Sequence, residues 1–256
     1  MTKTYSLITG ASSGIGRDLA YKLASEGHNV ILVARREQRL KEIAADIEEN
    51  YHVSAEYLVQ DIGDVASLDD FYEKTKAFQI NLWVNNAGIS VSGDFLEMDP
   101  NDILKMLKLN TGALAKLSIL YLQDYADEPV QLLNVSSVAG YALMEGAPLY
   151  SVSKHFVSTL TENLAHELAN KNKPARAKVL APAATETEFV GVVRGDAEAD
   201  VDYSEVFERY HTSEQMAEFA WELLESDKVV GIVDLDDFQF KLTDPQFKYA
   251  GGNYAV

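Results

Sequence analysis

Cysteine is absent from the 256 residues of this chain. Without thiols the chain cannot form disulfides, a thiolate metal site or a cysteine nucleophile, which is consistent with a reducing compartment. The five histidines show no metal-ligand spacing, so we expect no metal site. No stretch of the chain is apolar for long enough to span a membrane, and the first residues lack the apolar run of a signal peptide. We therefore expect a cytoplasmic protein.

Basic residues are scarce in this chain. It has 22 Lys and Arg against 40 Asp and Glu, for a formal charge of −18. Because nucleic acids and anionic membranes attract basic surfaces, we expect neither as a partner. The acidity is concentrated between residues 195 and 237, where 14 acidic side chains accompany only Arg209 and Lys228. This stretch is either a solvated face that aids solubility or a feature that disfavours anionic substrates.

Internal repeats and flexible linkers are also missing, so we expect one domain over residues 1–256. Short apolar runs alternate with amphipathic stretches of helical length. The expected strands are residues 5–9, 30–34, 53–59, 82–85, 130–136 and 177–181, with later helical segments around 65–77, 101–126 and 149–170. This alternation predicts an α/β fold, a Rossmann-type doubly wound parallel sheet that binds its ligand at the carboxyl ends of the strands.

A glycine-rich turn, Thr-Gly-Ala-Ser-Ser-Gly-Ile-Gly, follows the first expected strand. Glycines let the backbone approach a pyrophosphate closely, and the helix N-terminus beyond them presents unpaired amides. The turn taken alone could be only a tight strand-to-helix connection, but its position favours a dinucleotide site. The expected phosphate contacts are Gly10, Ser12, Ser13, Gly14, Ile15 and Gly16.

Two arginines follow the second expected strand, where dinucleotide-binding units recognise the adenosine ribose. An acidic residue there binds the 2′-hydroxyl of NAD, whereas an arginine accommodates the 2′-phosphate of NADP. We therefore expect NADP(H) in preference to NAD(H), with Arg35 as the first candidate and Arg36 as the second. An NAD-dependent protein remains the alternative.

Four further motifs follow in order: Asn85-Asn86-Ala87-Gly88, Asn110, Ser137, and Tyr150 with Lys154. Together with the glycine-rich turn they resemble the short-chain dehydrogenase/reductase superfamily over roughly residues 4–190. The resemblance implies an oxidoreductase that transfers a hydride between NADP(H) and a ketone, an aldehyde or a secondary alcohol. The implied catalytic residues are Asn110, Ser137, Tyr150 and Lys154. A non-catalytic NADP(H)-binding regulator or sensor is the alternative.

The residue types suit this chemistry. Tyr150 and Lys154 are four residues apart, so they share one face of a helix. A nearby ammonium lowers the pKa of a phenol, as does an oxidised nicotinamide ring, so Tyr150 can act as general acid or base. Ser137 would stabilise the developing charge on the same oxygen. The resemblance adds that Lys154 holds the nicotinamide ribose and that Asn110 holds a water linking the lysine to solvent.

Other cofactor contacts rest on the resemblance alone. They are Asp61 and Ile62 at the adenine, Asn86, Ala87 and Gly88 along the adenosine ribose, and Pro182, Thr185 and Thr187 near the nicotinamide carboxamide and the phosphates. Ala183 stands where the superfamily usually has glycine.

The residues expected to surround the substrate are apolar or aromatic, which indicates a mostly apolar substrate. They are Phe95, Tyr141, Leu143, Met144, Phe189 and Val192. Residues 188–210 resemble a lid over the substrate, and residues 229–256 form an atypical C-terminal strand and hairpin segment. Apolar residues on more than one face of helices 103–122 and 149–168 favour a homodimer or homotetramer.

Overall fold

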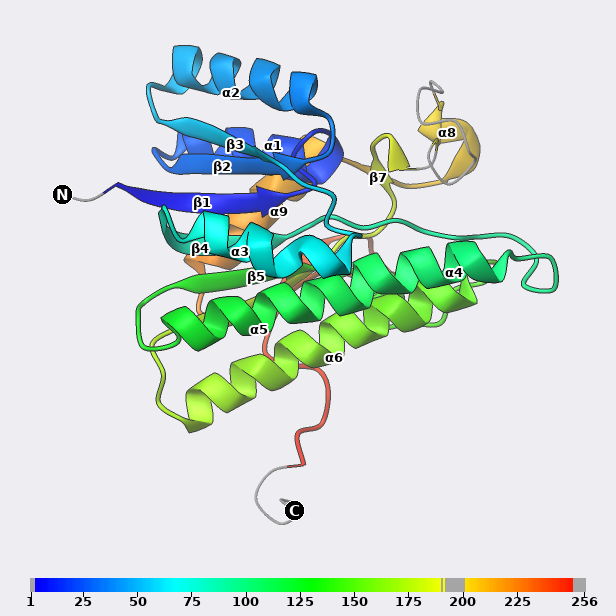
Figure 1. Cartoon of the computed structure of the whole chain (residues 1–256). Coiled ribbons are helices and arrows are strands. Elements are labelled where there is room, and N and C mark those ends of the chain that lie inside the picture. The colour runs from blue at the N-terminus through cyan, green and yellow to red at the C-terminus, as the bar shows by residue number, and fades with distance from the viewer. Residues whose placement is uncertain (1–2, 190, 192–200, 251–256) are drawn as a thin grey trace.

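The strands of the computed structural model, which describes residues 3–189, 191 and 201–250, form one eight-stranded sheet in the order β10-β9-β6-β5-β4-β1-β2-β3 (Figure 1). Its strands are β1 Thr4–Thr9, β2 Asn29–Ala34, β3 Ala55–Val59, β4 Gln79–Asn85, β5 Gln131–Val135, β6 Arg176–Ala181, β9 Val230–Val233 and β10 Phe240–Thr243. Only β10 is antiparallel to its neighbour. A second, two-stranded sheet pairs β7 Thr185–Glu186 with β8 His211–Thr212.

Helices cover both faces of the large sheet. The helices are α1 Gly14–Ser25, α2 Glu37–Tyr51, α3 Leu68–Thr75, α4 Pro100–Leu107, α5 Leu114–Tyr125, α6 Pro148–Asn170, α8 Tyr203–Val206 and α9 Ser213–Glu225. Short 3-10 turns span Val65–Ser67 and Val138–Gly140. Helices α1, α2 and α9 lie on one face, and α3, α5 and α6 lie on the other (Figure 1). This arrangement confirms the predicted single-domain Rossmann-type fold. No helix in the described ranges is long and apolar enough to cross a membrane.

Alternate residues of each central strand supply the two cores. Ile8 and Leu32 are buried under α1 and α2, whereas Leu7, Ile31 and Trp83 are buried under α3 and α5. Since neighbouring side chains of a strand point to opposite faces, a strand buried on both sides must be apolar throughout. This explains the continuous apolar runs in the sequence.

The chain reverses its direction of winding between β1 and β4. From β1 it moves outward to β2 and β3, and then it returns to β4 on the other side of β1. The helices that follow β1 and β4 therefore cover opposite faces of the sheet, and the carboxyl edge between them is where doubly wound proteins bind their ligands. The glycine-rich turn and the segment 86–88 both lie at this edge.

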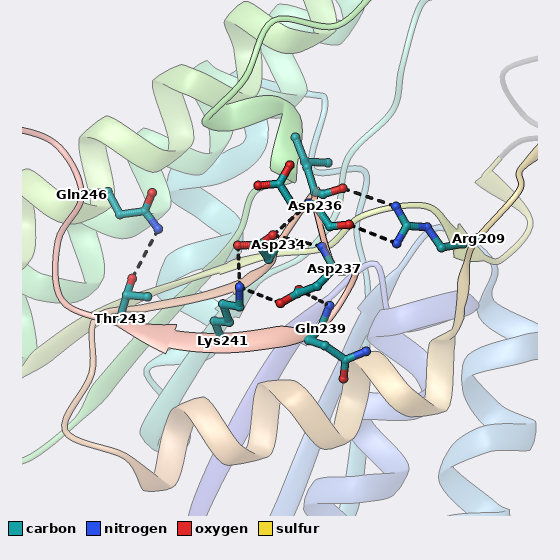
Figure 2. Close-up of polar contacts among 9 residues, drawn as sticks. Arg209, Asp234, Asp236, Asp237, Gln239, Lys241, Thr243 and Gln246 are labelled. Atoms are coloured by element: carbon teal, nitrogen blue, oxygen red, sulfur yellow. Dashed lines mark hydrogen bonds and ion pairs between the residues drawn. The ribbon is translucent and has the colours of Figure 1, made fainter.

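The hairpin of β9 and β10 extends the sheet beyond β6. Carboxylates build its turn: Asp234 accepts a hydrogen bond from the backbone N–H of Asp236 at 2.8 Å, and Lys241 pairs with Asp234 and Asp237 at 2.7 and 2.9 Å (Figure 2). Arg209 donates to two backbone carbonyls of the same turn. Some of the carboxylates of residues 195–237 therefore form the hydrogen bonds and ion pairs of this turn.

The segment after β10 runs back across α6. The backbone N–H groups of Gln246 and Phe247 both donate to Glu162, at 2.8 and 2.9 Å. Glu162 is only 1% exposed. The Phe247 ring stacks on Tyr141, with 5.3 Å between the ring centroids. The C-terminal segment is therefore attached to the helix that carries Tyr150 and Lys154.

Candidate active site

The loops after β1 and β4 are joined by hydrogen bonds at the carboxyl edge of the sheet. The Thr9 hydroxyl oxygen accepts hydrogen bonds from the backbone N–H groups of Asn86 and Ala87, at 3.0 and 3.1 Å. The Asn86 amide in turn donates to the Thr9 carbonyl at 3.0 Å. Gly10 has a φ of +70°, and a Cβ on Gly16 would lie 2.4 Å from the Asn86 amide nitrogen. Glycine is thus required for the turn and for this close packing.

The end of the glycine-rich turn is suited to an anion. Helix α1 begins at Gly14, its first turn carries no acidic side chain, and its N-cap, Ser13, makes no side-chain capping bond. The first turn of α1 itself therefore supplies no acidic group to its partial positive charge. The Arg36 guanidinium lies over the same turn and donates to the hydroxyls of Ser12 and Ser13, with distances of 2.7–3.1 Å. These groups fit a phosphorylated dinucleotide.

The two arginines after β2 differ in placement. Arg35, ranked first from the sequence, has an exposed side chain. Arg36, ranked second, is half-buried against the glycine-rich turn. Of the two, Arg36, at the N-cap of α2, is the arginine that contacts Ser12 and Ser13.

Other residues expected at the adenosine lie nearby in the fold. Ile62 is buried, and the Asp61 carboxylate is exposed and accepts the backbone N–H of Gly63 at 2.9 Å. A Cβ on Gly88 would lie 3.3 Å from the Asn110 side-chain oxygen and 3.6 Å from the Lys154 nitrogen. Glycine at position 88 therefore lets these two polar side chains reach the end of β4.

Asn110 lies in a π-helical turn, Lys108–Ala113, which interrupts the helix expected over 101–126. Such turns occur often at functional sites, because the wider turn changes the direction of a side chain. The Asn110 amide donates to the Ile89 carbonyl at 2.8 Å and its oxygen accepts the Ile89 N–H at 3.0 Å. It also donates to Ser153. Asn110 thereby joins the β4 loop to the helix of Tyr150 and Lys154.

Ser137, Tyr150 and Lys154 come together at the carboxyl end of β5. Ser137 is buried. Its hydroxyl accepts a hydrogen bond from the Ala139 N–H at 3.1 Å and donates one to the Pro182 carbonyl at 3.3 Å. Lys154 donates to the Val135 carbonyl at 3.0 Å. Its nitrogen lies 5.6 Å from the centre of the Tyr150 ring.

Burial controls the ionisation of this cluster. It raises the pKa of the Tyr150 phenol to about 12, an effect that the Ser137 hydroxyl partly offsets. It lowers the pKa of the Lys154 ammonium to about 8. From the sequence we expect Lys154 to lower the pKa of the Tyr150 phenol. In the structure that pKa is raised instead, because burial disfavours both the phenolate and the ammonium. Tyr150 holds its proton and is a potential acid.

Comparison with known proteins agrees with this arrangement. The family model described as short chain dehydrogenase matches residues 4–198. The chain belongs to the short-chain dehydrogenase family. Its family members are oxidoreductases, as is an uncharacterised oxidoreductase of Staphylococcus saprophyticus that is 30% identical over 205 residues, covering 79% of this chain and 87% of that protein.

Two solved structures resemble this short-chain dehydrogenase closely. A short-chain dehydrogenase from Sphingobium yanoikuyae in complex with NADPH has a TM-score of 0.82 and 30% identity, over 91% of this chain and 89% of that chain. A bulky-bulky ketone specific alcohol dehydrogenase from Comamonas testosteroni has a TM-score of 0.77 and 27% identity, over 91% and 87% of the two chains.

The segment after β6 in this short-chain dehydrogenase passes close to both halves of the site. The Pro182 carbonyl accepts the Val138 N–H at 2.8 Å, which fixes the segment beside Ser137. Thr185 lies in β7, and the Thr187 hydroxyl accepts the Phe189 N–H at 3.2 Å. The Phe189 ring lies 5.9 Å from the Tyr150 ring, measured between centroids.

The apolar residues expected at the substrate lie mostly on exposed loops. Phe95, Leu143 and Met144 are 65%, 94% and 40% exposed. Their loops are joined by a hydrogen bond from the Gly93 N–H to the Gly146 carbonyl at 2.8 Å. These residues therefore belong to two connected loops and are available to contact a ligand.

Tyr141 makes contacts that the sequence did not indicate. Its hydroxyl donates to Glu162 at 2.7 Å, and its ring stacks on Phe247. It connects the loop after Ser137 to the C-terminal segment, and its place at the substrate stays a prediction. Val192 lies outside the described residues.

Sequence reasoning missed a buried polar network beneath the site. The Asn85 amide donates to the Asn134 side-chain oxygen at 2.9 Å and to Ser118 at 3.0 Å, and Asn134 donates to Thr161 at 2.9 Å. The two asparagines are register partners on β4 and β5. The sequence did contain a sign of this network: each of two neighbouring apolar strands has an asparagine near its end, and a buried amide needs a hydrogen-bond partner.

Proposed function

We propose that this protein is an NADP(H)-dependent carbonyl reductase or alcohol dehydrogenase acting on a ketone, aldehyde or secondary alcohol of mostly apolar character. The observation that carries the proposal is the convergence of Ser137, Tyr150 and Lys154 at the carboxyl edge of the sheet, which also carries the glycine-rich turn. A protein that only binds a dinucleotide needs no proton donor beside a lysine and a serine.

The protein's residues supply the proton and hold the substrate oxygen. When bound, the reduced cofactor supplies a hydride to the carbonyl carbon. Tyr150, whose phenol keeps its proton up to high pH, gives that proton to the carbonyl oxygen as negative charge develops on it. The Ser137 hydroxyl donates a hydrogen bond to the same oxygen. In the reverse direction the Tyr150 phenolate takes the proton from the alcohol.

Lys154 returns the proton to Tyr150, and Asn110 supports the structure around the lysine. Lys154 is buried beside the Tyr150 ring, and its lowered pKa near 8 lets it gain and lose a proton around neutral pH. Its charged form favours the phenolate that remains after proton donation. Asn110 holds the loop after β4 against this helix, as its bonds to Ile89 and Ser153 support.

Arg36 is the residue that selects NADP(H). Its guanidinium presents parallel N–H groups over Ser12 and Ser13, the geometry that suits a phosphate. Arg36→Ala should raise the KM for NADPH by about ten- to hundredfold, the value of one or two charge-assisted bonds, and that for NADH by less than about threefold. Arg35→Ala is the matched control. An equal effect of Arg36→Ala on both cofactors would contradict this role.

The substrate's apolar character is supported by the loops that flank the site. Phe95, Leu143 and Met144 expose apolar surface, and Phe189 packs near Tyr150. Residues 188–210 serve as the lid over the substrate. The hydrogen bond from the Tyr203 hydroxyl to the Thr187 carbonyl, at 2.9 Å, supports this role because it joins the lid to the cofactor segment.

The decisive test is turnover with a Tyr150 variant. NADPH oxidation is followed with a panel of ketones and aldehydes, and Tyr150→Phe should lower kcat/KM by about 10²–10⁴-fold, the usual value of a general acid. Tyr51→Phe, on the exposed end of α2, is the matched control. Cofactor binding without turnover on any substrate would instead favour the regulatory alternative.

A further inference from the structure

The carboxylate of Glu188 lies on the same guanidinium that faces the glycine-rich turn. One of its oxygens is 2.7 Å from an Arg36 nitrogen, and the other is 3.8 Å from an Arg39 nitrogen. Arg36 simultaneously donates to Ser12 and Ser13. The ion pair therefore joins the start of α2 to the segment after β7.

Thr187, the residue before Glu188, packs directly on Gly14 at the start of α1. A Cβ on Gly14 would lie 2.9 Å from the Thr187 methyl group, so only glycine allows Thr187 to pack there. In Figure 1 β7 lies beside the start of α1. Glu188 is thus held at the anion-binding end of α1 by contacts on both sides.

We propose that Glu188 is a tethered competitor for the cofactor's 2′-phosphate, and that NADP(H) displaces it from Arg36 on binding. A carboxylate and a tetrahedral phosphate each present a pair of oxygens that accept paired hydrogen bonds from a guanidinium, so one can replace the other. The proposal rests on the proposed NADP(H) site at Arg36. NAD(H) has no 2′-phosphate and leaves the ion pair in place.

The exchange takes place beside the catalytic centre. Phe189 follows Glu188 directly, and its ring lies 5.9 Å from the ring of Tyr150, measured between centroids. The residue that competes for Arg36 is therefore the immediate neighbour of a residue that packs near Tyr150.

Binding calorimetry with fragments tests the competition without any turnover. The probes are adenosine 2′,5′-bisphosphate, which carries the 2′-phosphate, and 5′-AMP, which does not. Glu188→Gln should lower the Kd of the bisphosphate by about two- to fivefold, the range of a partly exposed ion pair, and change that of 5′-AMP by less than about 1.5-fold. Glu186→Gln is the matched control, since it removes one exposed carboxylate from the same segment.

A double-variant comparison isolates the ion pair from general charge effects. In an Arg36→Ala background, Glu188→Gln should leave the Kd of the bisphosphate unchanged. Unchanged or weaker binding of the bisphosphate to Glu188→Gln overturns the proposal, as does a bisphosphate that binds neither protein. Failure of the proposed function gives a different result. Turnover with NADPH is then absent, whereas the Kd of the bisphosphate can still be compared between the wild type and Glu188→Gln.

Discussion

Replacing Glu162 by glutamine tests whether the C-terminal segment is held by a single buried carboxylate. One oxygen of Glu162 accepts the Tyr141 hydroxyl, and the other accepts the backbone N–H groups of Gln246 and Phe247. Glutamine keeps one oxygen but places an NH₂ group against the remaining donors. The variant therefore loses at least one charge-assisted bond and leaves a buried donor unpaired.

The magnitude follows from these contacts. A hydrogen bond to a charged group contributes about 1.5–3 kcal/mol, and an unpaired buried donor costs a further amount of about 1–3 kcal/mol. The neutral side chain recovers part of this because it is easier to bury. We expect Glu162→Gln to lower the free energy of unfolding by about 2–4 kcal/mol and Tm by about 5–12 °C for a chain of this size.

Urea unfolding and trypsin cleavage measure the effect. Trypsin should cut after the exposed Lys248 faster in Glu162→Gln than in the wild type, because the segment detaches from α6. Glu49→Gln, on the exposed part of α2, is the control and should change stability by less than about 0.5 kcal/mol. A Glu162→Gln protein with wild-type stability and an equally protected Lys248 would refute the reasoning.

Three further predictions concern activity and assembly. Burial lowers the pKa of Lys154 to about 8, so this group is charged below pH 8 and neutral above it, and kcat/KM for carbonyl reduction should fall as pH rises through about 8. A pH profile without this step contradicts the role of Lys154. Matched ketones with and without a carboxylate should differ in kcat/KM, and more at low salt, if the acidic surface repels anions; equal rates leave the acidity as a solubility feature. Phe156→Glu should convert a homodimer or homotetramer to smaller species in light scattering, whereas Asn163→Glu on the same helix should not, because Phe156 is an exposed apolar residue of α6.

Most of the fold could be predicted from local pattern. The six strands expected from apolar runs all occur, with ends shifted by three residues or fewer, because a strand covered on both faces must be apolar along its whole length. The helical segment expected over 101–126 is confirmed, but it contains a π-turn at Lys108–Ala113 that the sequence did not indicate. Its residues have helical spacing on both sides, so periodicity does not reveal the extra residue.

The acidic stretch illustrates what composition leaves out. From sequence, residues 195–237 are one acidic region, part of which belongs to the expected lid. In the structure, the carboxylates between Glu214 and Glu225 lie on α9, which packs against α1, and those of 234–237 build the hairpin turn. Charge that is continuous in sequence is therefore distributed over separate surfaces, because a helix and a hairpin carry it to different places.

The sequence by itself determined the fold class, the glycine-rich turn and the identities of Ser137, Tyr150 and Lys154, because each depends on residue type and on spacing within one element. The tertiary structure decided which arginine faces the turn, that Tyr141 turns to Glu162, and that Glu188 reaches Arg36. These contacts join residues up to 152 positions apart. Their geometry depends on how strand ends and loops meet at the edge of the sheet, which no local pattern in the chain records.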